Sequence, residues 1–350
     1  MSESRYAPGP LLIDVAGHEL DAEDRELLAH PAVGGTILFS RNFHDPRQLR
    51  ALTDAMRACR PGLLVVADYE GGRVQRFRDG LTRIPPMRSY GRLWQRQPEQ
   101  AVDLARRTGW LVAAELAALG VNMPLAPVVD LDYGQSAVIG ERALAAHTEP
   151  ITALARALCA GLRDGGSVAT AKHFPGHGFV VPDSHAELPL DEREYAALAA
   201  DMAPYRSLIA DGLASVMMAH IRYPAVDDLP ASLSPHWIGH VLRGALGFAG
   251  SVFCDDLSMA GAAAMGDAQE RAGLALAAGC DWLPVCNDRA AVCTLVEAAA
   301  LREDGGDRRR EDLLTRCHPV SSAATLDALR KQTTWWQTAD RLRALTRDSA

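Results

Sequence analysis

Eight short apolar runs alternate with segments of helical periodicity along this 350-residue chain, and no other feature limits the possible fold as strongly. Each run is almost continuously apolar, which is typical of a strand buried on both faces of a parallel sheet. Helix signals lie between several of the runs, at 45–59, 99–120, 148–166 and 191–212. The runs themselves cover residues 10–15, 34–40, 63–68, 121–131, 167–173, 215–220, 250–256 and 280–286.

This alternation predicts an α/β protein that folds as a single (β/α)8 TIM barrel. A doubly wound open sheet alternates in the same way, but the phosphate-binding patterns G-x-G-x-x-G and G-x-x-x-x-G-K-[ST] are missing from the places where such a fold would need them. We predict a catalytic barrel over 1–300 and a C-terminal helical extension over 301–350, packed on the barrel. The charged run "REDGGDRRRED" at 302–312 is expected to form a solvated connection to the terminal helices.

Charge and composition exclude several classes of function. The net charge of −8 argues against nucleic-acid binding, which needs a basic face. No run approaches the ~20 apolar residues of a transmembrane helix, and the N-terminal segment does not resemble a signal peptide. The 7 cysteines are scattered, and their spacing fits neither a disulfide framework nor a zinc ribbon. We therefore expect a cytoplasmic, monomeric protein with reduced thiols, no metal, no cofactor and no nucleic-acid or membrane partner.

Polar residues follow five of the apolar runs, at the ends where a barrel enzyme collects its catalytic groups. The opposite ends of the runs carry mostly glycine, serine, proline and leucine. Any single polar residue at a strand end is equally well explained by contact with solvent, but the whole set indicates an active site. The set comprises Asp68, Asp130, Asp132, Lys172, His173, His220, Asp255 and Asp256.

Three short segments suggest chemistry for this site, although each has a simpler explanation on its own. In "ADYEGGRVQRF" (67–77), Asp68 and Arg76 could bind neighbouring hydroxyls of a ligand, or could form a salt-bridged turn. In "IGERAL" (139–144), a surface ion pair of Glu141 and Arg142 is the better explanation of the fragment alone. In "GSVFCDDLSM" (250–259), a carboxylate could act as a nucleophile, ligate a metal or cap a helix, and strand alternation predicts that only one of the two points into the site.

The loop "AKHFPGHGFVVPDSHAELP" (171–189) divides into parts with different expected roles. Lys172 and His173 still belong to the strand end, where both are expected to donate hydrogen bonds to hydroxyls or phosphate. Asp183 and His185 have the spacing of an Asp–His dyad, in which the carboxylate fixes the imidazole tautomer for proton transfer. His177 has no chemical role that the sequence assigns.

Taken together, these motifs resemble the family 3 glycoside hydrolases, in particular their single-domain β-N-acetylglucosaminidases (β-hexosaminidases) of peptidoglycan recycling. The resemblance spans roughly residues 8 to 300, and its most specific part is "KHFPGHG" followed by "DSH". Tyr69, Ala143 and Cys254 depart from the residues usual in the family, without removing a catalytic group. The matching motifs are "DYEGGRVQR" (68–76), "IGER" (139–142), "KHFPGHG" (172–178), "DSH" (183–185), "AH" (219–220) and "DDLSM" (255–259).

The resemblance implies a mechanism with retention of configuration and a role for each matching residue. Asp255 is implied as the nucleophile, and His185, oriented by Asp183, as the general acid/base. The implied substrate is a GlcNAc-β-1,4-anhydroMurNAc saccharide or its peptide-bearing form, from which the terminal GlcNAc is removed. The residues implied to bind or line the sugar site are Asp68, Arg76, Arg142, Lys172, His173, His220 and Met259.

Several alternatives stay open at this point. A histidine acid/base would not repel phosphate, so a β-N-acetylglucosaminide phosphorylase is one, and a chitobiose-cleaving hexosaminidase is another. A metal-dependent barrel hydrolase would need an H-x-H after the first strand, where the chain has a lone His18. A non-catalytic glycan-binding barrel would be expected to lack Asp255, Asp183 or His185, and all three are present.

Overall fold

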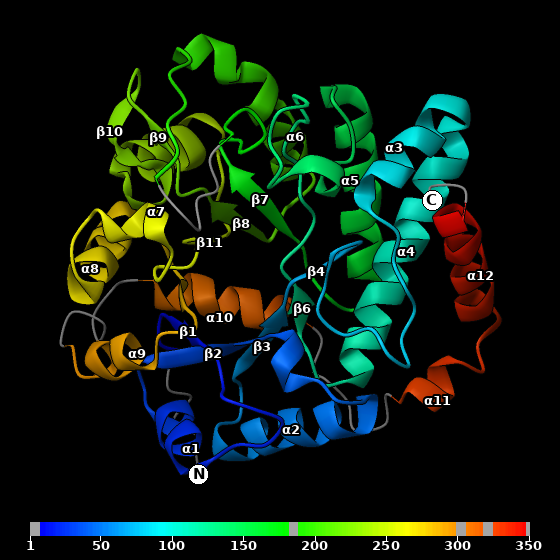
Figure 1. Ribbon diagram of the computed structural model, residues 1–350, viewed down its shortest axis with the longest axis horizontal. Helices are drawn as coiled ribbons and strands as arrows, with labels where there is room; N and C mark the ends of the chain where they lie inside the picture. Colours follow the sequence, from blue (N-terminus) through cyan, green and yellow to red (C-terminus); the bar gives the residue numbers. More distant parts are fainter. Residues whose placement is uncertain (1–7, 182–187, 299–305, 318–324, 348–350) are drawn as a thin grey trace.

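The computed structural model describes residues 8–181, 188–298, 306–317 and 325–347, and parallel strands lie at its centre with helices around them (Figure 1). The strands form a five-stranded parallel sheet in the order β12-β1-β2-β3-β6 and a three-stranded parallel sheet in the order β11-β8-β7. Each of the eight predicted runs overlaps one of these strands, which confirms the α/β class. Their bounds are β1 Leu11–Ile13, β2 Val33–Leu38, β3 Leu64–Ala67, β6 Met123–Pro124, β7 Thr170–Phe174, β8 Ser215–Met218, β11 Ser251–Phe253 and β12 Leu283–Val285.

Parallel bridges connect the edges of the two sheets. Val128, beyond the end of β6, pairs with Lys172 of β7, and Phe253 of β11 pairs with Trp282 beside β12. The flanking backbone supports both connections, because Val129 N donates to Lys172 O and Cys254 N donates to Trp282 O, each over 2.9 Å. The carboxyl ends of the strands in both sheets therefore face the same side of the molecule.

Three predicted helices occur almost as expected, and the fourth is shorter than predicted. They are α2 (Pro46–Cys59), α4 (Pro98–Ala118) and α5 (Thr148–Asp164). The first begins where it does because Asp45 accepts hydrogen bonds from the backbone of the first turn, with proline at the first helical position. The segment predicted at 191–212 instead forms a 3-10 turn, η3 (Tyr195–Leu198), followed by α6 (Ala199–Ala210).

The remaining elements are short hairpins, helices and turns that connect the strands and helices described above. Two short antiparallel hairpins, β4–β5 and β9–β10, follow β3 and β8. Helix α8 begins with an Asp267 capping box and ends at Gly279, which has a positive φ of 105°. The bounds are α1 Ala22–Ala29, β4 Tyr69–Gly71, β5 Val74–Gln75, α3 Met87–Arg96, β9 Arg222–Tyr223, β10 Asp227–Pro230, α7 Ala260–Ala263, α8 Ala268–Ala278 and α9 Arg289–Val296, with 3-10 turns η1 Ser40–Asn42, η2 Gly140–Arg142 and η4 Ala231–Leu233 and a π-helix, η5 His236–Ala245.

The C-terminal tail forms α10 (Asp307–Arg316), α11 (Leu326–Leu329) and α12 (Thr333–Arg347). Asp307, Arg308, Glu311 and Asp312 of the charged run at 302–312 are exposed, as expected, but they belong to a helix, and the expectation of a solvated connection is wrong for Arg310, which is 1% exposed and donates to Pro8 O and Asp281 O. Helix α12 lies along α4 (Figure 1), and Trp335 Nε1 donates to the buried Glu115 over 2.9 Å. In the ranges that the structure describes, no helix is both long and apolar enough to cross a membrane.

Candidate active site

A polar cavity of about 400 Å³ opens at the carboxyl ends of the parallel strands. It brings together seven of the predicted site residues, which come from segments far apart in the sequence: Asp68, Arg76, Arg142, Lys172, His173, Asp255 and Met259. Apolar side chains complete the wall, including Ile37, Phe39, Met217 and Pro284. Asp183 and His185 lie outside the described residues, so their position relative to this cavity is a prediction.

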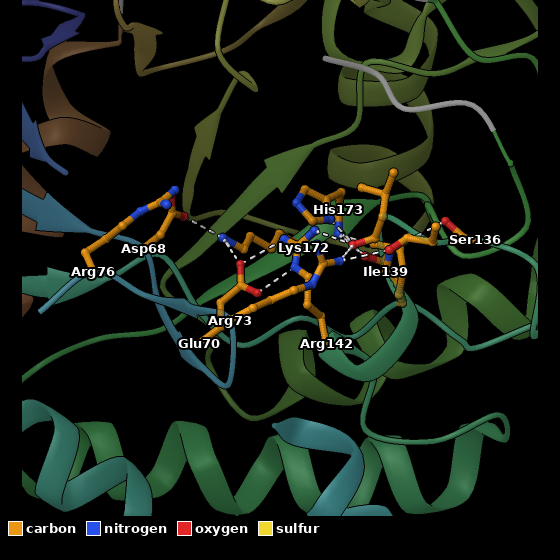
Figure 2. Close-up of polar contacts among 12 residues, drawn as sticks. Asp68, Glu70, Arg73, Arg76, Ser136, Ile139, Arg142, Lys172 and His173 are labelled. Carbon is orange, nitrogen blue, oxygen red and sulfur yellow. Dashed lines mark hydrogen bonds and ion pairs between the residues drawn. The ribbon is translucent and has the colours of Figure 1, made fainter. Parts of the chain in front are cut away.

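Five charged side chains of alternating sign form a continuous chain along the cavity wall (Figure 2). Arg76 donates to Asp68 over 2.7 Å, and Lys172 Nζ lies 2.8 Å from the other oxygen of the same carboxylate. Lys172 also lies 2.6 Å from Oε1 of Glu70. Arg142 closes the chain with two hydrogen bonds to Glu70, of 2.7 and 2.9 Å. Such an array presents fixed cationic donors and carboxylate acceptors to a ligand that carries several hydroxyl groups.

The hairpin β4–β5 makes this chain possible by turning the backbone back over the end of β3. Gly71 has a φ of +98°, and a Cβ there would lie 2.6 Å from Pro85 O, so a glycine is required. The Gln75 side chain then ties the hairpin to the next segment, since it donates to Thr82 O over 2.8 Å and accepts from Ile84 N over 3.0 Å. The result is that Arg76 returns to the strand end that carries Asp68.

The charges of this chain stabilise one another. Burial opposes the ionisation of Glu70, but Arg142 and Lys172 outweigh it and lower the pKa of Glu70 to about 2. Burial likewise opposes the ionised form of Asp68, and Lys172 and Arg76 together hold the pKa of that carboxyl well below its usual range. Lys172 is buried, yet Asp68 and Glu70 raise its pKa. Asp68, Glu70 and Lys172 are therefore charged at neutral pH.

Asp130 holds the part of the wall that carries the histidines. Its carboxylate lies 2.8 Å from His173 Nδ1 and accepts a 2.7 Å hydrogen bond from His177 N. Burial acts to raise the pKa of Asp130, but His173 and these hydrogen bonds lower it. His177, which had no predicted role, lines the cavity and packs against His173 with ring centroids 5.6 Å apart, and burial lowers its pKa to about 4.

The two aspartates after β11, Asp255 and Asp256, have different surroundings. Both residues line the cavity, just beyond the end of the strand at Phe253. Asp256 faces the turn: its carboxylate accepts from Ser258 N over 2.9 Å, from Ser258 Oγ over 2.8 Å and from Cys286 N over 3.1 Å. Burial raises the pKa of Asp256.

His220 does not line the cavity, contrary to the prediction. Its side chain is fully buried behind the wall, with Nε2 2.9 Å from Asp256 O and Nδ1 2.6 Å from Ser232 Oγ. A backbone carbonyl only accepts, so Nε2 carries the hydrogen and donates to Asp256 O. His220 thus braces the turn that follows Asp255 and has no direct path to a ligand in the cavity.

Sequence reasoning missed Glu70 as a member of the site, although a signal was present. Glu70 stands two residues after Asp68, and side chains two apart in an extended segment share a face. Among the described residues, no group of three or more histidine, cysteine, aspartate or glutamate side chains is arranged to hold a metal ion. The described part of the site offers carboxylates, cationic donors and imidazoles.

Residues 11–315 match the family model for the glycosyl hydrolase family 3 N-terminal domain. The chain is 47% identical over 345 residues to a beta-hexosaminidase from Thiobacillus denitrificans, covering 98% of this chain and 95% of that protein. It is 52% identical over 281 residues to one from Methylobacillus flagellatus, covering 80% of each chain.

A solved structure of native NagZ from Neisseria gonorrhoeae is similar throughout. It superposes with a TM-score of 0.90 at 38% identity, covering 97% of this chain and 98% of that one. The same neighbour has been solved in complex with N-trifluoroacetyl-D-glucosamine, with the same TM-score and coverage. The family match, the curated relatives and the shared fold agree: the chain belongs to glycoside hydrolase family 3, among its beta-hexosaminidases.

Proposed function

We propose that the protein is a retaining β-N-acetylglucosaminidase that removes the terminal, non-reducing GlcNAc from GlcNAc-β-1,4-anhydroMurNAc and its peptide-bearing forms, in the cytoplasm. One observation carries the proposal: Asp255 opens into the same cavity as the charged chain from Arg76 to Arg142. Hydroxyl groups both donate and accept, so a pyranose can bond to Asp68, Arg76, Arg142, Lys172 and His173 together. The neighbour that binds an N-acylated glucosamine supports an amino sugar at this position.

The proposed reaction is a double displacement. A carboxylate oxygen of Asp255 attacks the anomeric carbon while His185, oriented by Asp183, protonates the departing glycosidic oxygen. The bond between the anomeric carbon and the aglycone breaks, and a covalent glycosyl ester on Asp255 forms. His185 then accepts a proton from water, whose oxygen attacks the anomeric carbon and releases GlcNAc and the free carboxylate. Two inversions give net retention of configuration.

An anionic aglycone is supported by a basic extension of the cavity. A second hollow of about 300 Å³ shares Arg73 and Arg76 with the first and continues to Arg78 on the same hairpin. Arg73 donates to the carbonyls of Ala137 and Val138, and Arg78 to those of Gly72, Arg73 and Gln75. Neither guanidinium has a carboxylate partner among the described residues, so this hollow suits an anionic group of the aglycone: the lactyl carboxylate of peptide-free anhydroMurNAc, or a peptide carboxylate where the lactyl group is bound as an amide.

The proposal includes two features of the architecture and assembly. The bridges at Val128–Lys172 and Phe253–Trp282 support the closure of both sheets into one (β/α)8 barrel over 1–300, with 301–350 as its helical extension. We also infer that the monomer is sufficient for activity, because the charged chain and Asp255 come from one chain.

The test is product analysis by NMR on purified GlcNAc-anhydroMurNAc-peptide. We expect β-GlcNAc as the first product, followed by mutarotation, and no turnover by Asp255→Ala with an unchanged melting temperature. Undiminished turnover by Asp255→Ala, or α-GlcNAc as the first product, would refute the mechanism. GlcNAc-1-phosphate in the presence of inorganic phosphate would identify a phosphorylase, and a preference for chitobiose over the muropeptide would refute the substrate.

A further inference from the structure

Asp130 is a buried carboxylate whose contacts all lie on the wall of the active site. Its side chain is completely removed from solvent, whereas that of His173 is 8% exposed and lines the cavity. One carboxylate oxygen lies 2.8 Å from His173 Nδ1, and the other accepts from His177 N over 2.7 Å. His173 N also faces the carboxylate, at 3.2 and 3.3 Å from its two oxygens. Every partner of this carboxylate is therefore an N–H group or the Nδ1 atom of His173.

Backbone N–H groups, which only donate, face both oxygens of Asp130: His177 N lies 2.7 Å from Oδ1, and His173 N lies 3.2 and 3.3 Å from Oδ1 and Oδ2, an arrangement that favours the ionised carboxylate, which can only accept hydrogen bonds. His173 Nδ1 must then carry a hydrogen. In a neutral imidazole the other ring nitrogen, Nε2, is consequently an acceptor with a free lone pair. In the described part of the chain, His173 Nε2 has no hydrogen-bond partner. It is also absent from the buried side-chain atoms that lack a partner, so it is accessible from the cavity that His173 lines.

We propose that Asp130 is a positioning residue, which holds neutral His173 as the Nδ1–H tautomer so that Nε2 accepts a hydrogen bond from a donor group of the bound sugar. The sequence suggested the opposite role, a histidine that donates. An acceptor is useful at this place because Lys172, Arg76 and Arg142 can only donate. Both oxygens of Asp68 already accept from Arg76 and Lys172. His173 thus supplies an uncommitted acceptor on a wall dominated by donors.

The variant Asp130→Asn separates this role from a merely structural one. The asparagine oxygen can still accept from His177 N, while its amide N–H group can donate to His173 Nδ1. That contact would move the imidazole hydrogen to Nε2 and convert an acceptor into a donor. Asp132→Asn is the matched control, because Asp132 follows the same strand but pairs with Arg88.

The first measurement is the tautomer itself, read from two- and three-bond ¹H–¹⁵N correlations of ¹⁵N-histidine-labelled protein, with His173 assigned from its missing signals in His173→Gln. We expect the Nδ1–H form in the wild type and in Asp132→Asn, and the Nε2–H form in Asp130→Asn. An Nε2–H form or an imidazolium at pH 7.5 in the wild type would overturn the proposal. The tautomer measurement does not depend on turnover, so its outcome is independent of the proposed function. Only the identity of the bound sugar rests on the proposed function.

The second measurement asks which sugar group donates. Aryl β-GlcNAc glycosides with fluorine in place of the hydroxyl at C3, C4 or C6 keep the shape of the sugar but cannot donate at that position. One analogue should lose about tenfold or more in kcat/KM with the wild type, as expected for one lost hydrogen bond at a polar wall. With Asp130→Asn the loss for that analogue should shrink to about threefold or less. An unchanged loss in Asp130→Asn, or no sensitive analogue, would refute acceptance from a hydroxyl by His173.

Discussion

The ammonium group of Lys172 lies 2.6 Å from Oε1 of Glu70, and both side chains are almost completely removed from solvent. Lys172 has a second carboxylate partner in Asp68, 2.8 Å away. Arg142, by contrast, meets only Glu70 among the carboxylates of the described residues, through two hydrogen bonds. Glu70 is therefore the one anion that holds both cations together, although it was not among the predicted site residues.

Glu70→Gln should weaken both substrate binding and stability. Arg142 would lose its carboxylate partner while its side chain stays only 12% exposed, which costs up to roughly 3–5 kcal/mol of unfolding free energy. Because Arg142 would no longer be fixed, KM for an aryl β-GlcNAc glycoside should rise by about tenfold or more. Steady-state kinetics and urea unfolding check the two effects. The control is Glu141→Gln, since Glu141 is exposed beside Arg142; equal effects of both variants would contradict the assignment.

The acid stability of the protein should depend on Glu70. Its pKa falls from an ordinary value of 4.5 to about 2 on folding, so the ionised form stabilises the native state fully above pH 4.5. This contribution, on the order of 3 kcal/mol, is lost as the pH falls through 2. The difference in unfolding free energy between the wild type and Glu70→Gln should therefore shrink between pH 5 and pH 2. A difference that stayed constant over this range would show that the carboxylate does not carry the effect.

The strands were predictable because burial on two faces leaves a continuous apolar run, a local signal. The run at 121–131 shows the limit of that signal, because only Met123–Pro124 is a ladder strand and a single bridge follows at Val128. Pro124 and Pro127 lack the backbone N–H that a longer ladder would need. An apolar run thus predicts that a segment lies in the core. The prolines in the run limit how many of its residues form hydrogen bonds with neighbouring strands.

Asp68, Lys172, His173 and Asp255, which line the cavity, were predictable from their place at strand ends. Arg76, Arg142 and Met259 were expected from the family resemblance, and the partners of the charged residues were not predictable. Arg142 pairs with Glu70, which lies 72 positions away, whereas the sequence suggested a surface pair with its neighbour Glu141. Arg310 belongs to a charged run that predicts a solvated segment, yet its side chain is buried and donates to Asp281 O and Pro8 O. The choice of partner for a charged side chain depends on distances in the folded chain, which local patterns do not contain.

The basic hollow predicts selectivity for acidic aglycones. Arg73→Gln should lower the ratio of kcat/KM for GlcNAc-anhydroMurNAc to kcat/KM for a neutral aryl glycoside by about tenfold, since one charge-assisted contact would be lost. Taking the ratio cancels any effect on the shared GlcNAc site. Raising the salt concentration should lower the wild-type ratio in the same direction. Arg92→Gln, an exposed arginine of α3 that lines neither hollow, should leave the ratio unchanged; an unaltered ratio in Arg73→Gln would refute the subsite.

Two adjacent tryptophans of α12 should differ sharply in their contribution to stability. Trp335 is 6% exposed and its Nε1 donates to the buried Glu115, which also accepts from Thr82 N and Oγ, whereas Trp336 is 53% exposed. Trp335→Phe keeps an aromatic ring but removes the donor, which should cost about 1–3 kcal/mol of unfolding free energy.

Trp336→Phe should change the unfolding free energy by less than about 0.5 kcal/mol. Urea unfolding of the two variants provides the comparison, because both lose the same atoms from neighbouring positions of one helix. Turnover of the aryl glycoside below the unfolding transition should stay at the wild-type level in both, since α12 packs on α4 and supplies no cavity residue within the described ranges. Equal destabilisation by the two substitutions would mean that the Trp335–Glu115 hydrogen bond does not anchor the C-terminal helix.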